Sequence, residues 1–153
     1  MTDGHGGFRY DGKRTLVVGC YSGMGESTAK IVQGLGGEVH GVDYKSPDFE
    51  LASFTSCDLR DKADIESMLS SLKGPFDAVF YCAGLSTAHP APQIMRVNAA
   101  AVRTVIEGVE SLVPRGGAMS IISSTGGLGF FAHMAPIMEL LSTDGFDGAV
   151  VFW

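Results

Sequence analysis

The 153-residue sequence has few basic residues, few cysteines and no long hydrophobic run. Eleven Lys and Arg residues stand against seventeen Asp and Glu residues, which gives a formal net charge of −6. Proteins that bind nucleic acids by neutralising phosphates normally present a basic face, so we expect no nucleic-acid partner. No segment approaches the roughly 18 consecutive apolar residues that cross a bilayer, so we also expect no membrane partner.

The sulfur and imidazole ligands are too few and too scattered for a metal or disulfide framework. The three cysteines are odd in number and contain no CxxC pair, which favours reduced thiols in a cytoplasmic protein. The four histidines show no ligand spacing, so no metal site is expected. The N-terminus lacks the apolar segment of a secretion signal. Residues 1–13 are polar and rich in glycine, and we expect them to form a flexible leader.

Glycine, in contrast, is abundant: 21 of 153 residues, against a usual share of about 7%. The length fits one domain with a real core. Apolar runs predict strands at 15–18, 38–42, 54–56, 77–82 and 118–123, and helical periodicity predicts helices at 23–34, 61–72 and 92–113. Strands that are apolar throughout need cover on both faces. The order therefore predicts an α/β fold, a Rossmann-like doubly wound parallel sheet over residues 14–153.

A glycine-rich turn lies directly between the first predicted strand and the first predicted helix. Residues 19–25 read Gly-Cys-Tyr-Ser-Gly-Met-Gly. At this place the N–H groups of a helix N-terminus can meet the pyrophosphate of a dinucleotide, and glycines let the phosphates approach the backbone. The spacing is GxxxGxG and not GxGxxG, so the position between strand and helix carries the argument.

Asp43 closes the second predicted strand, 18 residues after Gly25. A carboxylate there can accept hydrogen bonds from both ribose hydroxyls of the adenosine and would repel a 2′-phosphate. The glycine turn contains no Arg or Lys that would offset this repulsion, although Lys45 is close. The sequence therefore favours NAD over NADP. The alternative is that the glycines are ordinary turn residues and Asp43 an ordinary carboxylate at a strand end.

Several segments resemble, in order, the short-chain dehydrogenase/reductase family, and most closely its small hydroxysteroid and alcohol dehydrogenases. They are Gly19-x-x-x-Gly23-x-Gly25, Cys57-Asp58-Leu59, Tyr81-Cys82-Ala83-Gly84, Val97-Asn98 and Ile121-Ile122-Ser123-Ser124. The resemblance implies that Asp58 holds the adenine amino group. The cofactor residues that we expect are Gly19, Ser22, Gly23, Met24, Gly25, Asp43, Asp58, Leu59, Cys82, Ala83 and Gly84.

The same resemblance implies two catalytic residues, Ser124 and Asn98. Ser124 would hydrogen-bond the substrate carbonyl, and Asn98 would kink its helix and hold a water of the proton relay. Simpler roles stay open for several residues. Asp58 or its neighbour Asp61 could cap the following helix, either of Ser123 and Ser124 could be a turn residue, and Cys82 could be a small buried hydrophobe. A substrate pocket or an apolar core is equally open for Phe130, Phe131, Met134 and Met138.

The sequence lacks the family's Tyr-x-x-x-Lys pair, in which a lysine helps to lower the pKa of the catalytic phenol. All four tyrosines precede Ser124, the last lysine is Lys73, and 29 residues follow Ser124. Residues 147–153 are largely apolar, and we expect them to be exposed. This favours a C-terminally truncated chain whose sheet is incomplete on its C-terminal side and whose full-length form is a homo-oligomer.

The resemblance implies an NAD-dependent oxidoreductase that transfers hydride between nicotinamide and a secondary alcohol or ketone. Its partner would be a small-molecule alcohol or ketone substrate, and the chain alone would be inactive without the Tyr/Lys pair. A non-catalytic dinucleotide-binding or redox-sensing module is the main alternative. A third is a methyltransferase with a nucleoside cofactor, which would leave Asn98 and Ser124 unexplained.

Overall fold

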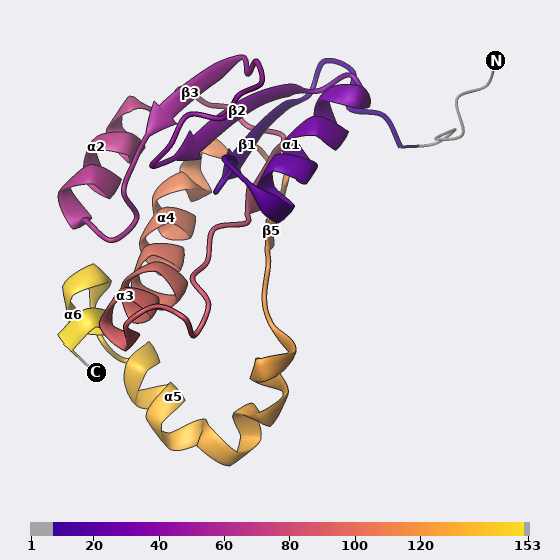
Figure 1. Ribbon diagram of the computed structural model, residues 1–153. Helices are drawn as coiled ribbons and strands as arrows, with labels where there is room; N and C mark the ends of the chain where they lie inside the picture. Colours follow the sequence, from indigo (N-terminus) through magenta and orange to yellow (C-terminus); the bar gives the residue numbers. More distant parts are fainter. Residues whose placement is uncertain (1–7, 152–153) are drawn as a thin grey trace.

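The computed structural model describes residues 8–151, and its centre is a five-stranded parallel sheet in the order β3-β2-β1-β4-β5 (Figure 1). All four strand pairs are parallel. The strands are β1 Arg14–Val18, β2 Glu38–Asp43, β3 Ser53–Ser56, β4 Ala78–Tyr81 and β5 Ala118–Ile121. Each of the five predicted strands is present, with ends that differ by no more than two residues.

Helices cover both faces of the sheet, as apolar parallel strands require. Leu16 and Val18 point into one core cluster, and Val17 between them points into the other, because successive side chains of a strand face opposite sides. The smaller core contains side chains of α1 (Gly23–Gly34), and the larger core contains side chains of α2 (Lys62–Ser71) and α4 (Val102–Val109). The doubly wound fold predicted from the sequence is thus confirmed.

The long helix predicted at 92–113 is continuous in extent but changes its winding three times. It consists of α3 (Ala91–Met95), a π-helical turn η1 (Arg96–Ala101), α4 and a 3₁₀ turn η2 (Glu110–Leu112). Asn98 lies inside the π-helical turn. A π turn inserts extra backbone into a helix and is common at functional sites, so the irregularity implied at Asn98 is present.

No strand or helix was predicted after the fifth strand, and the structure contains three helical segments there. They are η3 (Thr125–His133, 3₁₀), α5 (Met134–Leu141) and α6 (Gly145–Val151). Figure 1 shows η3 and α5 as an arm that leaves the sheet and returns to α3 through α6. The expected exposure of the apolar tail is wrong where the structure describes it, because Ala149 on α6 is buried in the larger core. Residues 152 and 153 lie outside the described residues.

One further expectation about burial needs correction. Strand β5, at the edge of the sheet, is exposed along its whole length. The expectation that all strands are covered on both faces therefore holds only for the interior of the sheet.

The predicted leader falls partly outside the described residues, which begin at residue 8. Within it, the Tyr10 N–H donates to the Leu35 carbonyl at 2.9 Å, and the Tyr10 side chain packs against the smaller core. Between residues 8 and 151, none of the helices combines the length and hydropathy that crossing a membrane requires.

Candidate cofactor site

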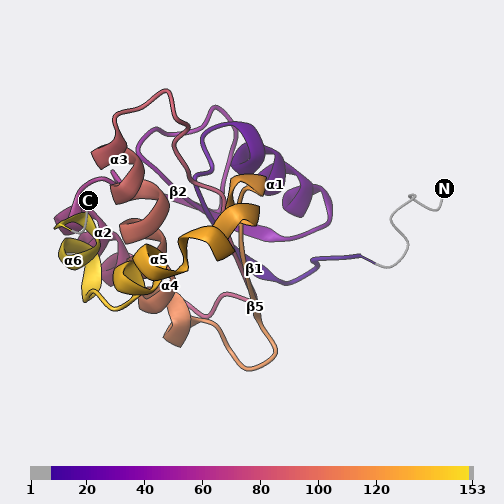
Figure 2. The same cartoon turned by 90° about the horizontal axis from the view of Figure 1, so that it is seen from below.

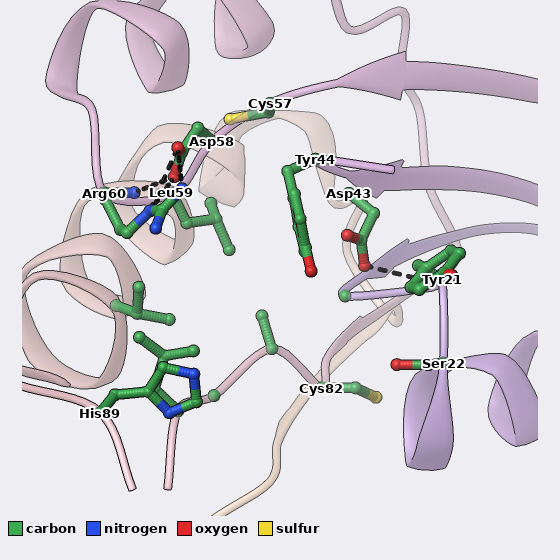
Figure 3. Close-up of a pocket in the computed structure, with 15 residues that line it drawn as sticks. Tyr21, Ser22, Asp43, Tyr44, Cys57, Asp58, Leu59, Arg60, Cys82 and His89 are labelled. Carbon is green, nitrogen blue, oxygen red and sulfur yellow. Dashed lines mark hydrogen bonds and ion pairs between the residues drawn. The ribbon is translucent and has the colours of Figure 1, made fainter. Parts of the chain in front are cut away.

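A cavity of about 350 Å³ lies at the carboxyl ends of β1, β2 and β4 (Figure 3). In this sheet β1 is flanked by β2 on one side and β4 on the other. The chain first adds β2 and β3 on one side of β1 and then crosses over to add β4 and β5 on the other side, so the strand order reverses at β1. Open α/β sheets bind ligands in the crevice at such a switch point. The lining residues are Gly19, Tyr21, Ser22, Asp43, Tyr44, Cys57, Asp58, Leu59, Arg60, Cys82, Ala83, Gly84, Leu85, His89 and Val97.

The turn between β1 and α1 brings its backbone unusually close to neighbouring chain. Gly19 has φ +88°, and a Cβ added to it would lie 2.5 Å from the Ala83 nitrogen. A Cβ at Gly25 would overlap the carbonyl oxygen of Gly19. Side chains are therefore excluded where the turn passes β4 and where α1 begins. This leaves backbone as the wall of the cavity at the helix N-terminus.

The N-terminus of α1 is suited to receive an anion. Ser22 is the N-cap residue, but its side chain makes no capping hydrogen bond to the first turn of the helix. Ser22 lines the cavity at the start of α1 (Figure 3). The first N–H groups of a helix lack partners within it and carry the positive end of the helix dipole. A phosphate in the cavity could accept hydrogen bonds from them.

Asp43 is the last residue of β2, and its side chain is buried in the wall of the cavity. Its Oδ2 accepts a hydrogen bond from the Tyr21 N–H at 3.0 Å, which ties the carboxylate to the glycine turn (Figure 3). Its Oδ1 accepts from the Lys45 N–H at 3.4 Å. The carboxylate is thus held in a fixed place beside the turn, with capacity for further donors because each oxygen can accept more than one hydrogen bond.

Lys45 is the cation nearest to Asp43 in the sequence, and two aromatic rings accommodate it. Its Nζ lies 5.4 Å from the centre of the Tyr21 ring and 5.2 Å from that of Tyr44. The two rings meet edge to face, with centroids 6.4 Å apart. Cation–π attraction therefore holds the ammonium beside the two rings.

Asp58 lies at the other end of the cavity and is paired with Arg60. The guanidinium donates to both carboxylate oxygens, at 2.8 Å to Oδ1 and 2.6 Å to Oδ2, and the Arg60 N–H donates to Oδ1 at 2.9 Å. These hydrogen bonds hold the pKa of Asp58 below its usual range. Asp61, and not Asp58, caps α2, because its Oδ1 accepts the N–H groups of Ala63 and Asp64. The capping alternative for Asp58 is therefore wrong.

A second cavity, of about 410 Å³, adjoins the first across residues 82–84. It is lined by Met24, Cys82, Ala83, Gly84, Asn98, Val102, Ile121, Ile122, Ser123 and Ser124. Both proposed catalytic residues thus face one cavity, together with the alternative Ser123. The Ser124 Oγ accepts the Gly126 N–H at 3.1 Å and so also caps η3.

Asn98 makes a paired contact with the chain that follows β4. Its Oδ1 accepts the Leu85 N–H and its Nδ2 donates to the Leu85 carbonyl, both at 2.8 Å. The amide group therefore positions the segment that joins the two cavities. Cys82 in that segment is half-buried, and its Sγ lies 3.9 Å from the Thr28 hydroxyl. Partial burial raises the pKa of the Cys82 thiol.

Most residues expected to contact a cofactor line one of the two cavities; Gly23 and Gly25 line neither. The expected cofactor residues omitted seven that line the first cavity: Tyr21, Tyr44, Cys57, Arg60, Leu85, His89 and Val97. Tyr44 and Arg60 could have been found from their position, since each lies within two residues of an expected site residue. The apolar residues 130, 131, 134 and 138 are exposed and line neither cavity. Within residues 8–151, no group of three His, Cys, Asp or Glu residues could hold a metal ion.

The sheet order, the glycine turn and the cavity at the switch point define a Rossmann-like α/β domain. Residues 15–141 match the NAD dependent epimerase/dehydratase family, and the chain belongs to this family. The family is of the short-chain dehydrogenase/reductase type, so the resemblance found in the sequence motifs is confirmed.

The chain is similar to several dehydrogenases. It is 30% identical over 135 residues to a coniferyl-alcohol dehydrogenase from Pseudomonas sp. (strain HR199 / DSM 7063), an alignment that covers 88% of this chain and 53% of the relative. A short chain dehydrogenase family protein from Francisella tularensis subsp. tularensis SCHU S4 superposes with a TM-score of 0.68 at 20% identity, over 84% of this chain and 63% of that one. A short-chain dehydrogenase/reductase from Burkholderia multivorans with bound NADP gives a TM-score of 0.62 at 23% identity, over 75% and 60%. The chain thus spans about half the length of the curated relative.

Proposed function

We propose that this chain forms the cofactor-binding part of an NAD-dependent oxidoreductase that acts on a secondary alcohol or ketone. The observation that carries the proposal is the buried Asp43 carboxylate at the end of β2. It lies in the wall of the first cavity and is held against the glycine turn by the Tyr21 N–H. A carboxylate there favours ribose hydroxyls over a 2′-phosphate. The similarity to a coniferyl-alcohol dehydrogenase supports an alcohol as the substrate class.

The residues present fit a dinucleotide along both cavities. Gly19 and the start of α1 would hold the pyrophosphate, Asp43 the adenosine ribose, and Asp58 with Leu59 the adenine. Ala83 and Gly84 lie where the two cavities adjoin and would contact the middle of the molecule. The nicotinamide, when bound, supplies or accepts the hydride.

The second cavity would receive the substrate. Ser124 would donate its hydroxyl hydrogen to the carbonyl oxygen of a ketone and so stabilise the charge that develops there. Asn98 would hold the wall of this cavity through its two hydrogen bonds to Leu85. The side chains of Val102, Ile121 and Ile122 would exclude water from the apolar part of the substrate.

The cofactor preference is tested by titration of the whole chain with NADH and NADPH, followed by nicotinamide fluorescence. We expect NADH to bind at least about tenfold more tightly, because a 2′-phosphate would meet the Asp43 carboxylate and one poorly compensated charge contact costs 1.4 kcal/mol or more. Equal or tighter binding of NADPH would contradict the preference and assign the adenosine end to Lys45 instead.

A non-catalytic dinucleotide-binding or redox-sensing module is the second candidate, and the placement of the phenols favours it for this chain. No tyrosine in residues 8–151 lines the cavity of Ser124. Tyr81 is buried, donates to the Val97 carbonyl at 3.2 Å, and its pKa is raised by desolvation. A buried phenol with a raised pKa is a poor base at neutral pH.

We therefore expect the chain to bind NADH, but to oxidise secondary alcohols, and also primary cinnamyl-type alcohols, with NAD at a rate indistinguishable from the protein-free control. The measurement is the change in absorbance of NADH on incubation with alcohol or ketone. A robust rate that is lost in Ser124→Ala would overturn this expectation and show that another group moves the proton.

A further inference from the structure

The arm after β5 returns to the domain and docks α6 on the helix that carries Asn98. Phe146, at the start of α6, is 3% exposed and belongs to the same core cluster as Val97 and Ala101 of η1. Segment 140–143 before α6 is fastened to α4, since Arg103 donates to the carbonyls of Thr143 at 2.6 Å and Leu140 at 3.0 Å. α6 lies beside α3, as Figure 2 shows, and it contacts α3, η1 and α4. The end of the described chain is thus a fixed part of the domain.

Arg96 connects this docked helix to the adenine end of the first cavity. Its guanidinium lies over the Phe146 ring, 5.9 Å from the centroid. The same guanidinium donates through Nη1 to the Arg60 carbonyl at 3.0 Å. One side chain therefore contacts both α6 and the segment between β3 and α2, two parts of the chain about 86 residues apart.

Segment 57–61 carries the cavity residues on that side. Its first residues are held by the sheet and the core, since the Cys57 N–H donates to the Asp43 carbonyl at 2.9 Å and the side chains of Cys57 and Leu59 are buried in the larger core. Asp58 and Arg60 pair with each other inside the segment, and Asp61 caps α2. Lys62, the first residue of α2, forms an ion pair with Asp147 of α6 at 2.6 Å, but both side chains are largely exposed. Exposed ion pairs contribute little. At the exposed Arg60, further along the segment, the Arg96 hydrogen bond to the backbone carbonyl adds a contact from outside.

We propose that Arg96 is a positioning residue for the adenine end of the cofactor site, coupling the docking of α6 to the placement of Asp58 and Arg60. Arg96 does not line the cavity, so it acts through the backbone of segment 57–61. The inference rests on the proposed function, since it assumes that a dinucleotide occupies the cavity. Its first consequence, the rigidity of segment 57–61, does not depend on any ligand.

The first test measures backbone hydrogen exchange in the ligand-free chain. In Arg96→Met the N–H groups of residues 57–61 are expected to exchange at least about threefold faster than in the wild type, because the segment opens locally more often once the Arg60 carbonyl loses its hydrogen bond from Arg96. Arg115→Met is the matched control. Arg115 is an exposed residue before β5 that lines neither cavity, and its replacement removes the same charge.

The second test compares three ligands that share parts of the dinucleotide. Arg96→Met is expected to weaken NADH and AMP about three- to tenfold, the effect of a binding group held less firmly after loss of a charge-assisted hydrogen bond. Nicotinamide mononucleotide, which has no adenine, is expected to bind all variants equally. Arg96→Lys keeps a cation over the ring and a donor for the carbonyl, and it is expected to restore at least half of the lost affinity on a logarithmic scale.

Phe146→Leu provides the same test should Arg96→Met fail to fold, since it keeps an apolar contact for α6 and removes the ring beneath the guanidinium. The inference is overturned if the Arg96 or Phe146 variant matches Arg115→Met both in exchange at residues 57–61 and in AMP affinity. It is also overturned if nicotinamide mononucleotide weakens as much as AMP, which would indicate general damage. Wild-type chain that binds no NADH would refute the proposed function, while faster exchange in Arg96→Met would still support the coupling.

Discussion

Alanine in place of Gly19 is expected to abolish detectable NADH binding and to lower the free energy of unfolding by about 2–4 kcal/mol. Two costs combine at this position. The backbone has φ +88°, where any side chain is strained, and the new Cβ would lie 2.5 Å from the Ala83 nitrogen. Ala83 cannot withdraw freely, because its N–H donates to the Val18 carbonyl at 3.1 Å. Urea unfolding and a fluorescence titration with NADH measure the two effects.

Gly12→Ala separates conformational strain from steric overlap. Gly12 has a similar φ of +69°, but an added Cβ there meets nothing within 4 Å among the described residues. Its replacement is expected to cost only the strain, about 1–2 kcal/mol, and to leave NADH affinity unchanged. If Gly19→Ala lowered the free energy of unfolding no more than Gly12→Ala, the close approach of Gly19 to Ala83 would contribute nothing to the cost of the substitution.

The central sheet could be predicted from the sequence because its signals are local. A short apolar run that ends at glycine marks β1, and a helical pattern follows directly, so strand, turn and helix are fixed within about 20 residues. The placement of Asp43 follows in the same way, since a strand end in a parallel sheet lies at the same edge as the ends of its neighbours. Residues whose position depends only on their own strand were therefore placed correctly.

The arm after β5 could not be predicted, because its structure depends on partners far away in the sequence. Residues 125–133 are rich in glycine and form a 3₁₀ helix of nine residues, although their sequence shows no helical periodicity of apolar residues. Ala149 lies in the segment 147–153 that the sequence suggested would be exposed, but Ala149 and the preceding Phe146 are buried with Val97 and Ala101 of η1. Burial of this kind is a property of the packed chain and not of the segment.

The partners within the site were hidden for a similar reason. Spacing along the chain indicated that Asp58 and Asn98 matter. It did not reveal the hydrogen bonds from the Arg60 guanidinium to the Asp58 carboxylate, or the paired contact of Asn98 with Leu85. Arg60 was within two residues of a predicted site residue and could have been found as the neighbouring cation. The contact from Asn98 to Leu85 spans 13 residues between helix and loop, and only the fold brings the two together.

Removal of the Asp43 carboxylate has the second largest effect that we expect. Asp43→Ala should weaken NADH about 10- to 100-fold, because a hydrogen bond to a charged group contributes about 1.5–3 kcal/mol. NADPH should weaken much less, since the repulsion of its 2′-phosphate disappears with the carboxylate. Alanine also leaves the Tyr21 N–H without its acceptor, and this could loosen the glycine turn by itself.

Asp43→Asn distinguishes the charge from that structural role. The amide oxygen can still accept the Tyr21 N–H, while the negative charge is lost, so we expect the turn to hold and the ratio of NADH to NADPH affinity to fall at least about tenfold. Asp48→Asn is the matched control, an exposed acid beyond β2 that lines neither cavity. Should Asp43→Asn keep the wild-type ratio of NADH to NADPH affinity, the carboxylate would only stabilise the glycine turn through its hydrogen bond to the Tyr21 N–H. The preference for NAD would then have to come from the shape of the cavity around Tyr44, whose exposed ring stands beside Asp43 (Figure 3).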